Sequence, residues 1–511
     1  MKRIWLAVIL IVLSLAFCAL GQVDRVEYSD FSGGLYAGYD SRKCPPNQFL
    51  ELKNCIIQAD GSLTVRGGFR KIVVPDNVTE AGHLFRFDGF PIITRTAGST
   101  GVYANFVGSS TQLPLGFVTG FVSAATMDDY LIYGGYGGAL YTWYKYATMA
   151  ANITSSRIQD IIAHNDRVFY ASEGTLYESA VGSATDFAGG EAWVVGGGEG
   201  GEITGLGQAD GSLYVFKERK IFRMDGYSPS ERVFTKISDI VGCTAGGNPI
   251  SFKSASIGDG IIFPTDRSDL YMIANSQVYD VCSHIKKLLP GPGANFRLTL
   301  SRKLGLGIFY EETNDTWYAL HLDSITARPG GFFIPVSQWY LTPKTSSSLP
   351  ILIGGEDDFC ATTGEENGGA STPLFLYYDT RSASNMAIDN FNSATMTPVI
   401  SVKTSFDPLG DERYLKNVRK ITVRCSSKES AGTGLATTTT SFNFSSAVVS
   451  SATETASLAT ESVKIISYPS GYFERISINF LISGATPLSG NGQTINIHSI
   501  IADYVLGSRV Y

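Results

Sequence analysis

The sequence predicts an all-β protein: an extended N-terminal arm, a β-propeller of about seven blades and a C-terminal β-sandwich. Three observations predict it. A strand pair recurs seven times, apolar and polar residues alternate after about residue 395, and helical periodicity is scarce beyond the first residues. The composition agrees, because 55 glycines, 12% aromatic and 17% charged residues suit a folded chain with many tight turns.

The recurring unit is a turn with Asp or Gly, a short apolar strand and, about twelve residues later, a second strand centred on Leu-Tyr or a similar pair. Successive copies start 41, 37, 44, 49, about 45 and about 46 residues apart, which is the range for a four-stranded propeller blade. The alternative is a series of β-sandwiches whose spacing coincides by chance. The first strands of the copies are residues 88–93, 129–133, 166–170, 210–216, 259–263, 304–310 and 350–353, and the second are centred on residues 102–103, 140–141, 176–177, 221–222, 270–271, 317–318 and 374–375.

We expect four segments in a chain of 511 residues: a leader over 1–21, an extended arm over 22–80, a propeller over 81–392 and a sandwich over 393–511. The Ser-, Thr- and Ala-rich stretch over 426–460 fits either a mobile excursion or an exposed hairpin. The glycine-rich stretch over 196–201 is interpreted as a flexible connection between blades.

The first residues resemble a secretory signal. Lys2 and Arg3 precede an apolar run, and Ala19-Leu20-Gly21 offers a small-x-small cleavage site. We expect a mature chain that begins near Gln22 and has no stable membrane insertion, and the alternative is an uncleaved anchor. Removing the two cations moves the formal charge from −7 to −9, which disfavours loose adhesion to nucleic acid.

Six cysteines follow the leader, and an oxidising compartment could pair them. Cys44 and Cys55 are the closest two in sequence and are the candidate disulfide, although buried unpaired thiols are an equal alternative. No Cys-x-x-Cys spacing is present, so a zinc site has little support.

No catalytic motif is complete. The sequence has no HExxH, GxSxG, phosphate-loop or EF-hand pattern, and the aspartate box of sialidase propellers is missing. We therefore expect no enzyme activity, no cofactor and no metal. The five histidines, His83, His164, His284, His321 and His498, are interpreted as structural. Three acidic pairs in loops are interpreted as solvated turn charges, with calcium binding as the alternative for these pairs; they are Glu311-Glu312, Asp357-Asp358 and Glu365-Glu366.

Short motifs in the arm resemble, in the same order, the start of many bacteriophage virion proteins. An FSGGL-type opening at residues 31–35 is followed by a PPNQ-type turn at 45–48, a strand leading to Asn54, and a DGSL hairpin that runs into Arg66-Gly67-Gly68. Residues 201–226 are similar to a blade of that family, and residues 415–421 and 495–500 to its closing sandwich.

This resemblance implies a structural component of a phage tail or neck, nozzle-like, assembled with other virion subunits as a homo-oligomer around a channel through which DNA passes without sequence-specific binding. It implies a location in the virion. The residues it points to as assembly-motif candidates are Phe31, Gly33, Gly34, Leu35, Pro46, Asn47 and Asn54. The alternative, which the leader favours, is a secreted, periplasmic or surface-anchored propeller that recognises glycan or protein.

Overall fold

The structure, a computed structural model, is all-β in the residues that it describes, with four short 3-10 helices and no α-helix among them. It forms two compact units: unit 1 comprises Met1–Val65 and Val399–Tyr511, and unit 2 comprises Arg66–Pro398. The described residues are 23–37, 43–66, 69–72, 81–87, 90–95, 101–105, 112–117, 121–135, 139–145, 151–154, 156–245, 249–267, 269–281, 283–289, 296–301, 305–311, 316–339, 351–354, 359–363, 374–378, 389–391, 394–396, 400–404, 414–427, 433–442, 450–457, 463–467, 472–473, 476–483 and 495–509.

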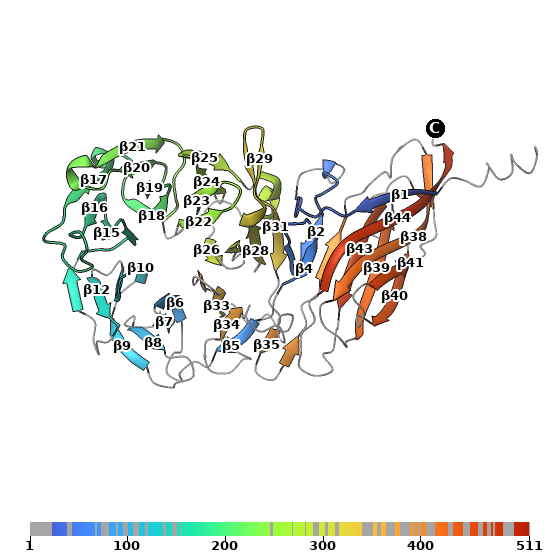
Figure 1. The fold of residues 1–511 in the computed structure, drawn as a ribbon, viewed down its shortest axis with the longest axis horizontal. Coiled ribbons are helices and arrows are strands. Elements are labelled where there is room, and N and C mark those ends of the chain that lie inside the picture. Colours follow the sequence, from blue (N-terminus) through green and yellow to red (C-terminus); the bar gives the residue numbers. More distant parts are fainter. Residues whose placement is uncertain are drawn as a thin grey trace, which may run out of the picture. The chain divides into compact units, whose positions relative to one another are not determined.

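Unit 2 contains seven successive groups of four antiparallel strands in the order of a propeller blade; five are separate four-stranded sheets, and the last two are parts of larger sheets. Figure 1 shows β10 to β25 following one another from cyan to green. The blades are β6 (Ala81–Phe87), β7 (Phe90–Arg95), β8 (Gly101–Asn105) and β9 (Gln112–Phe117); β10 (Phe121–Met127), β11 (Tyr130–Gly135), β12 (Ala139–Tyr144) and β13 (Ala151–Thr154); β14 (Asp160–His164), β15 (Arg167–Ser172), β16 (Thr175–Glu178) and β17 (Ala192–Val194); β18 (Ile203–Ala209), β19 (Ser212–Lys217), β20 (Ile221–Asp225) and β21 (Val233–Ser238); β22 (Ile250–Ser254), β23 (Gly258–Pro264), β24 (Leu270–Ala274) and β25 (Gln277–Asp280); β26 (Phe296–Ser301), β27 (Leu306–Glu311), β28 (Thr316–His321) and β31 (Val336–Trp339); and β32 (Ile351–Gly354), β33 (Phe359–Thr363), β34 (Leu374–Tyr378) and β5 (Phe69–Ile72).

The first strands of the blades contact one another in ring order, and β32 of the seventh blade contacts β6 of the first. The described strands of unit 2 therefore form a closed propeller, among which seven four-stranded groups are described. The seventh blade takes its fourth strand from the beginning of the unit, because β5 pairs antiparallel with β34 from Ile72↔Phe375 to Phe69↔Tyr378. This pairing ties the two ends of the ring together and covers an edge that would otherwise be open.

The blades are held together by apolar cores that lie between them. Between the second and third blades, Ile132 and Leu140 pack with Ile161 and Tyr170. The same arrangement continues between the third and fourth blades and between the fourth and fifth. Each sheet thus buries an apolar face against its neighbour, a face that an isolated blade would leave in contact with water. The residues of these two later cores include Phe169, Leu176, Val195, Leu206, Leu213, Val215 and Phe222, and Tyr214, Phe216, Ile221, Ile261, Phe263 and Ile273.

The recurring strand pair of the sequence corresponds to the second and third strands of a blade in the first six copies, from β7–β8 to β27–β28. The seventh copy of the repeat is offset by one strand, because its first strand, residues 350–353, matches β32, which is the first strand of the blade and not the second. The true second strand, β33, begins at Phe359, directly after the acidic pair Asp357-Asp358.

Unit 1 is built from two antiparallel sheets that combine strands from both ends of the chain. In one sheet, β1 (Val23–Tyr28) and β4 (Leu63–Val65) both pair with β44 (Ile495–Arg509). In the other, β2 (Glu51–Lys53) pairs with β37 (Ile400–Lys403). Figure 1 shows these blue N-terminal strands beside the red and orange C-terminal ones. The remaining strands are β3 (Cys55–Ile57), β38 (Tyr414–Ser427), β41 (Val463–Ser467) and β42 (Tyr472–Phe473), and β43 (Ile476–Ser483), β39 (Thr433–Phe442) and β40 (Ser450–Ser457).

The observed units divide the chain after Val65 and Pro398, whereas the sequence suggested boundaries after residues 80 and 392. The difference at the N-terminal boundary has a physical cause. Residues 69–72 belong to the last blade, and the strands over 23–65 complete the sheets of the expected sandwich through backbone pairing. Of the two alternatives for residues 426–460, the structure has the hairpin, β39 paired with β40. The expected leader lies outside the described residues.

Gly33 offers a test of how unit 1 is held together. A Cβ atom at this position would meet the backbone oxygen of Asn47, so we expect Gly33→Ala to lower the free energy of unfolding by about 1–3 kcal/mol. Gly174→Ala is the matched control, because its nearest neighbour, the Gly201 oxygen, would be 3.8 Å from the new Cβ. Chemical denaturation of both variants measures the difference, and equal midpoints would refute the close packing at Gly33.

Candidate functional site

The FSGGL-type segment lies in the interior of unit 1. Phe31 and Leu35 are 0% and 1% exposed, and the Phe31 ring stacks on Phe49 with centroids 4.9 Å apart. Gly34 has a φ of 64°, a conformation that favours glycine. The Phe49 amide donates to the Gly34 oxygen at 2.9 Å, and the Tyr36 amide to the Phe49 oxygen at 2.8 Å. These contacts fold the segment onto residues 45–50.

The PPNQ-type turn supplies the other half of this buried cluster. Gln48 is 2% exposed and its Nε2 donates to the Gly33 oxygen at 3.1 Å. Pro46 is exposed and Asn47 half-buried at the outside of the turn. Asn54 is buried with a φ of 55°, which asparagine tolerates better than most residues. Of the seven assembly-motif candidates, only Pro46 is therefore exposed as a potential contact with another molecule.

The candidate disulfide between Cys44 and Cys55 is not formed, because Cys44 is a free thiol. Its Sγ donates to the oxygens of Gln48 at 3.2 Å and Pro45 at 3.6 Å, within the turn. Burial raises the pKa of the Cys44 thiol to about 12, which keeps it protonated and poorly nucleophilic.

One concave feature of unit 2 is a cavity of about 920 Å³, which we call the mouth cavity. Its lining residues come from five successive blades, the second to the sixth, at or near the turns that join the first strand of each blade to the second. They are Met127, Asp128, Ala163, His164, Asn165, Asp166, Arg167, Gln208, Ala209, Gly211, Ser251, Phe252, Lys253, Asp259, Leu300, Gly305 and Leu322. The mouth cavity therefore lies at one end of the ring formed by the first strands.

The turns at the mouth cavity explain the Asp-containing pattern of the sequence. Asn165 and Asp166 have φ values of 48° and 56°, and Asp210 and Gly211 have values of 51° and 73°. Two successive residues with positive φ form the tight hairpin turn that matches the twist of antiparallel strands, and Asn, Asp and Gly are the residues that adopt it. The third and fourth blades contribute such turns at the same end, and Asp128 of the second blade also has a positive φ, 51°, so the repeat gathers carboxylates there.

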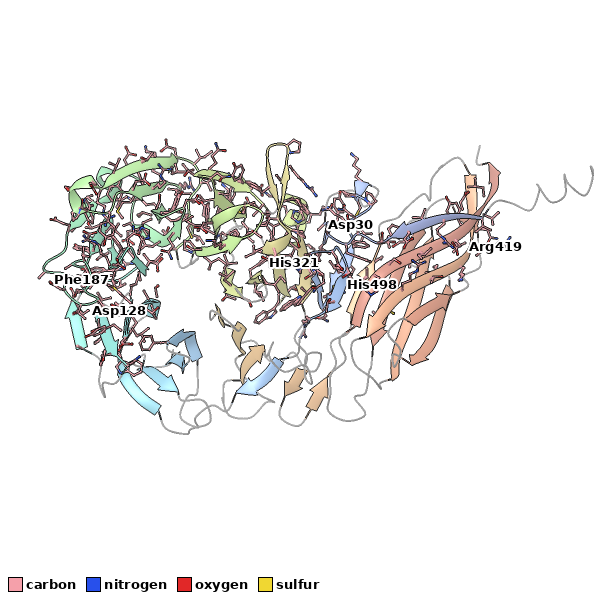
Figure 2. All side chains as sticks on the ribbon, viewed as in Figure 1. Asp30, Asp128, Phe187, His321, Arg419 and His498 are labelled. Carbon is pink, nitrogen blue, oxygen red and sulfur yellow. The ribbon has the colours of Figure 1, made fainter. Side chains whose placement is uncertain are left out.

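Three carboxylates at this end have no side-chain partner. Asp128, Asp166 and Asp210 form no side-chain hydrogen bond or ion pair within the described part of the chain. By contrast, Glu199 contacts Lys220 at 2.7 Å and Lys236 at 3.0 Å on the outer part of the fourth blade. Figure 2 labels Asp128 beside the strands of the second blade. The mouth cavity thus keeps negative charge that the protein's own cations do not neutralise.

A polar network fixes two amide side chains at the mouth cavity. His164 is 7% exposed; its Nδ1 lies 3.2 Å from Gln208 Oε1, and its Nε2 lies 3.0 Å from Asn165 Nδ2. This arrangement requires the tautomer with the proton on Nδ1. Burial lowers the pKa of His164, so the ring is neutral at pH 7 and both contacts are maintained.

Buried charge joins the third and fourth blades behind the mouth cavity. Glu178 is 0% exposed and accepts from Arg167 Nη1 at 2.8 Å and Arg232 Nη2 at 3.0 Å. Arg167 and Glu178 belong to the third blade, whereas Arg232 precedes β21 of the fourth. The Arg232 guanidinium also lies 5.4 Å from the centre of the Phe169 ring. Because the Glu178 carboxylate pairs with arginines of both blades, these buried ion pairs form only when the two blades keep this relative position.

Two further buried groups fasten the same pair of blades. Asp160 of β14 accepts from the Leu206 amide of β18 at 2.6 Å, and burial raises the pKa of its carboxyl to about 6. Lys217 is 0% exposed and its Nζ donates to the oxygens of Val195 at 3.0 Å and Glu199 at 2.6 Å. The glycine-rich stretch expected to be flexible is thus a carbonyl-lined turn, in which Gly196 and Gly197 have φ values near 60°.

The described histidines are structural in their contacts. His321, labelled in Figure 2, is 2% exposed, its Nε2 lies 3.0 Å from Ser337 Oγ, and burial lowers its pKa to about 3. Burial also lowers the pKa of His284 to about 3. The side chains of His83 and Glu311 lie outside the described residues, as do Glu312, Asp357, Asp358, Glu365 and Glu366. Within the described part of the chain, no three His, Cys, Asp or Glu side chains gather in a way that could hold a metal ion.

The blade repeat and the mouth cavity can be compared with known proteins. No protein-family model matches the chain, and no curated protein matches its sequence. Among solved structures, the computationally designed Ika8 protein is 11% identical with a TM-score of 0.38, and covers 67% of this chain and 98% of its own. YCF48 bound to D1 peptide is 10% identical with a TM-score of 0.39, and covers 62% of this chain and 97% of its own. The mitotic checkpoint complex is 10% identical with a TM-score of 0.41, and covers 62% of this chain and 96% of its own.

With TM-scores below 0.5, these similarities assign no function to the chain, and the propeller is defined by its own sheets and their ring order. Among the residues that the structure describes, no helix is both long enough and apolar enough to span a membrane.

Glu178 allows the coupling of the two blades to be measured. We expect Glu178→Gln to lower the free energy of unfolding by about 3–5 kcal/mol, because two buried guanidinium groups lose their counter-charge. Asp266→Asn is the control: it breaks the Arg219–Asp266 pair, in which the Arg219 side chain is 63% exposed, and we expect a change of about 0–1 kcal/mol. Urea denaturation at pH 7 compares the variants, and similar losses for both would contradict the proposed coupling.

Proposed function

We propose that the chain is a non-catalytic structural subunit of a bacteriophage virion, at the tail or neck, in which the propeller is a rigid body and subunits assemble around a channel for DNA. The observation that carries the proposal is that residues of the motifs resembling phage virion proteins help to form the interior of unit 1. Phe31, Gly34, Leu35 and Asn54 are buried or take special backbone conformations in unit 1. Motifs of this kind specify an architecture, so sharing them in the same order supports a shared architecture.

Two surface features agree with an assembly role. The outermost strands of the third and fourth blades carry exposed apolar side chains, Val194 at 61% and Val233 at 58% exposed, and Ile240, two residues after β21, is 80% exposed. Trp193 and Phe234, next to Val194 and Val233, have ring centroids 6.3 Å apart, so the two strands are neighbours. Apolar residues along the free edges of outer strands suit a contact with another subunit.

The charge of the protein suits DNA passage without adhesion. The formal charge is −7, and the carboxylates of Asp128, Asp166 and Asp210 have no neutralising partner in the described residues. Clustered cations on a protein attract the phosphate groups of DNA, whereas clustered carboxylates repel them.

The test is expression of the full-length chain in a bacterium, followed by fractionation, N-terminal sequencing, light scattering and negative-stain microscopy. We expect an intact chain that forms ring-shaped oligomers, and we expect Val233→Glu with Ile240→Glu to convert them to monomers by burying charge in the contact. Val181→Glu is the control, because Val181 is 51% exposed but lies in the loop after β16. A monomer at every concentration would contradict the proposal.

The mouth cavity favours a second candidate function, an exported propeller that binds a ligand through its blade turns. In that case the same experiment gives a monomeric chain outside the cytoplasm that begins near Gln22.

A further inference from the structure

The mouth cavity has the dimensions of a small-molecule site. Its volume of about 920 Å³ falls in the range of pockets that enclose most of a bound organic ligand. The turns of separate blades form its walls, and each blade is fixed by the apolar cores behind it. Such a site is largely formed before a ligand arrives, which reduces the entropic cost of binding.

The lining combines two kinds of surface. Apolar side chains line it together with carboxylates and amides. A purely apolar ligand would leave the polar groups without hydrogen bonds, and a small ion would leave the apolar groups uncovered. The apolar members are Met127, Ala163, Ala209, Phe252, Leu300 and Leu322.

The polar groups include both acceptors and donors. Asp128 and Asp166 are exposed carboxylates without a partner among the described side chains. Arg167 is 5% exposed, and although its Nη1 donates to Glu178, its Nε has no hydrogen-bond partner. The amides of Asn165 and Gln208 are oriented by His164 and add further donors and acceptors.

A hydroxyl group both donates and accepts, so it can satisfy a carboxylate and an N–H donor within one site. A cation would satisfy only the carboxylates. An anion would be repelled by Asp128 and Asp166, because the pocket cations are already engaged: Arg167 is paired with Glu178, and Lys253 lies 3.8 Å from Asp259.

We propose that the mouth cavity binds a neutral saccharide. The carboxylates of Asp128 and Asp166 accept hydrogen bonds from sugar hydroxyls, the Asn165 and Gln208 amides contact further hydroxyls, and the apolar residues contact the C–H faces of the rings. Charge-assisted hydrogen bonds to the two carboxylates supply much of the affinity. The inference needs only the propeller and is independent of the assembly role, so either proposal can fail without the other.

The test uses the full-length chain with maltohexaose, the tetramer of N-acetylglucosamine and a mannan oligosaccharide as neutral probes. A galacturonate oligomer and tetralysine are the acidic and basic comparisons. Saturation-transfer NMR and calorimetry at millimolar ligand report binding. We expect saturable binding of at least one neutral oligosaccharide and none of the acidic one.

The variant is Asp128→Gly with Asp166→Gly, because both residues have positive φ values, 51° and 56°, that glycine adopts without strain. We expect the dissociation constant of the bound saccharide to rise about tenfold or more. Glu173→Gly is the matched control: it also removes an exposed acid from a turn with a positive φ, 54°, but one that does not line the mouth cavity, and we expect unchanged binding.

Several outcomes would overturn the inference: binding of none of the three neutral oligosaccharides, equal binding of the acidic one, binding of tetralysine alone, or equal affinity in the double variant. Thermal unfolding of the double variant within about 1 kcal/mol of the parent confirms that the blades remain folded.

Discussion

The antiparallel pairing of β5 with β34 is the interaction on which the architecture of unit 2 depends. It joins residues 69–72 to residues 374–378 and so closes a ring of seven blades by backbone hydrogen bonds. Without it, the seventh blade would lack its fourth strand and the contact between β32 and β6 would have less support. The turns that line the mouth cavity hold their positions because the ring that carries them is closed.

Buried charge adds specificity where apolar packing alone would allow the blades to slide. Between the third and fourth blades, Glu178 is shared by two arginines, Asp160 accepts a backbone amide and Lys217 donates to two carbonyl oxygens. Each group would be costly to bury without its partner, so these contacts favour one register between the blades. The same two blades carry Val194 and Val233, exposed residues of the proposed subunit contact.

Much of the fold could be predicted from the sequence because the repeat marks the second and third strands of the first six blades with turn residues and apolar pairs. The closing strand could not, because nothing local to residues 69–72 says that their partner lies about three hundred residues later. The same limit applies to β1 and β4, which pair with β44. The Asp turns were visible individually, but only the ring brings Asp128 and Asp166 to one cavity.

Native-state hydrogen exchange of the full-length chain tests ring closure most directly. If β5 is the fourth strand of the last blade, its amides exchange only through the global opening that also exposes the inner strand β18, with equal protection in both. Fast exchange of residues 69–72 while β18 stays protected would show that the ring is open, and would contradict the account of both the propeller and the mouth cavity.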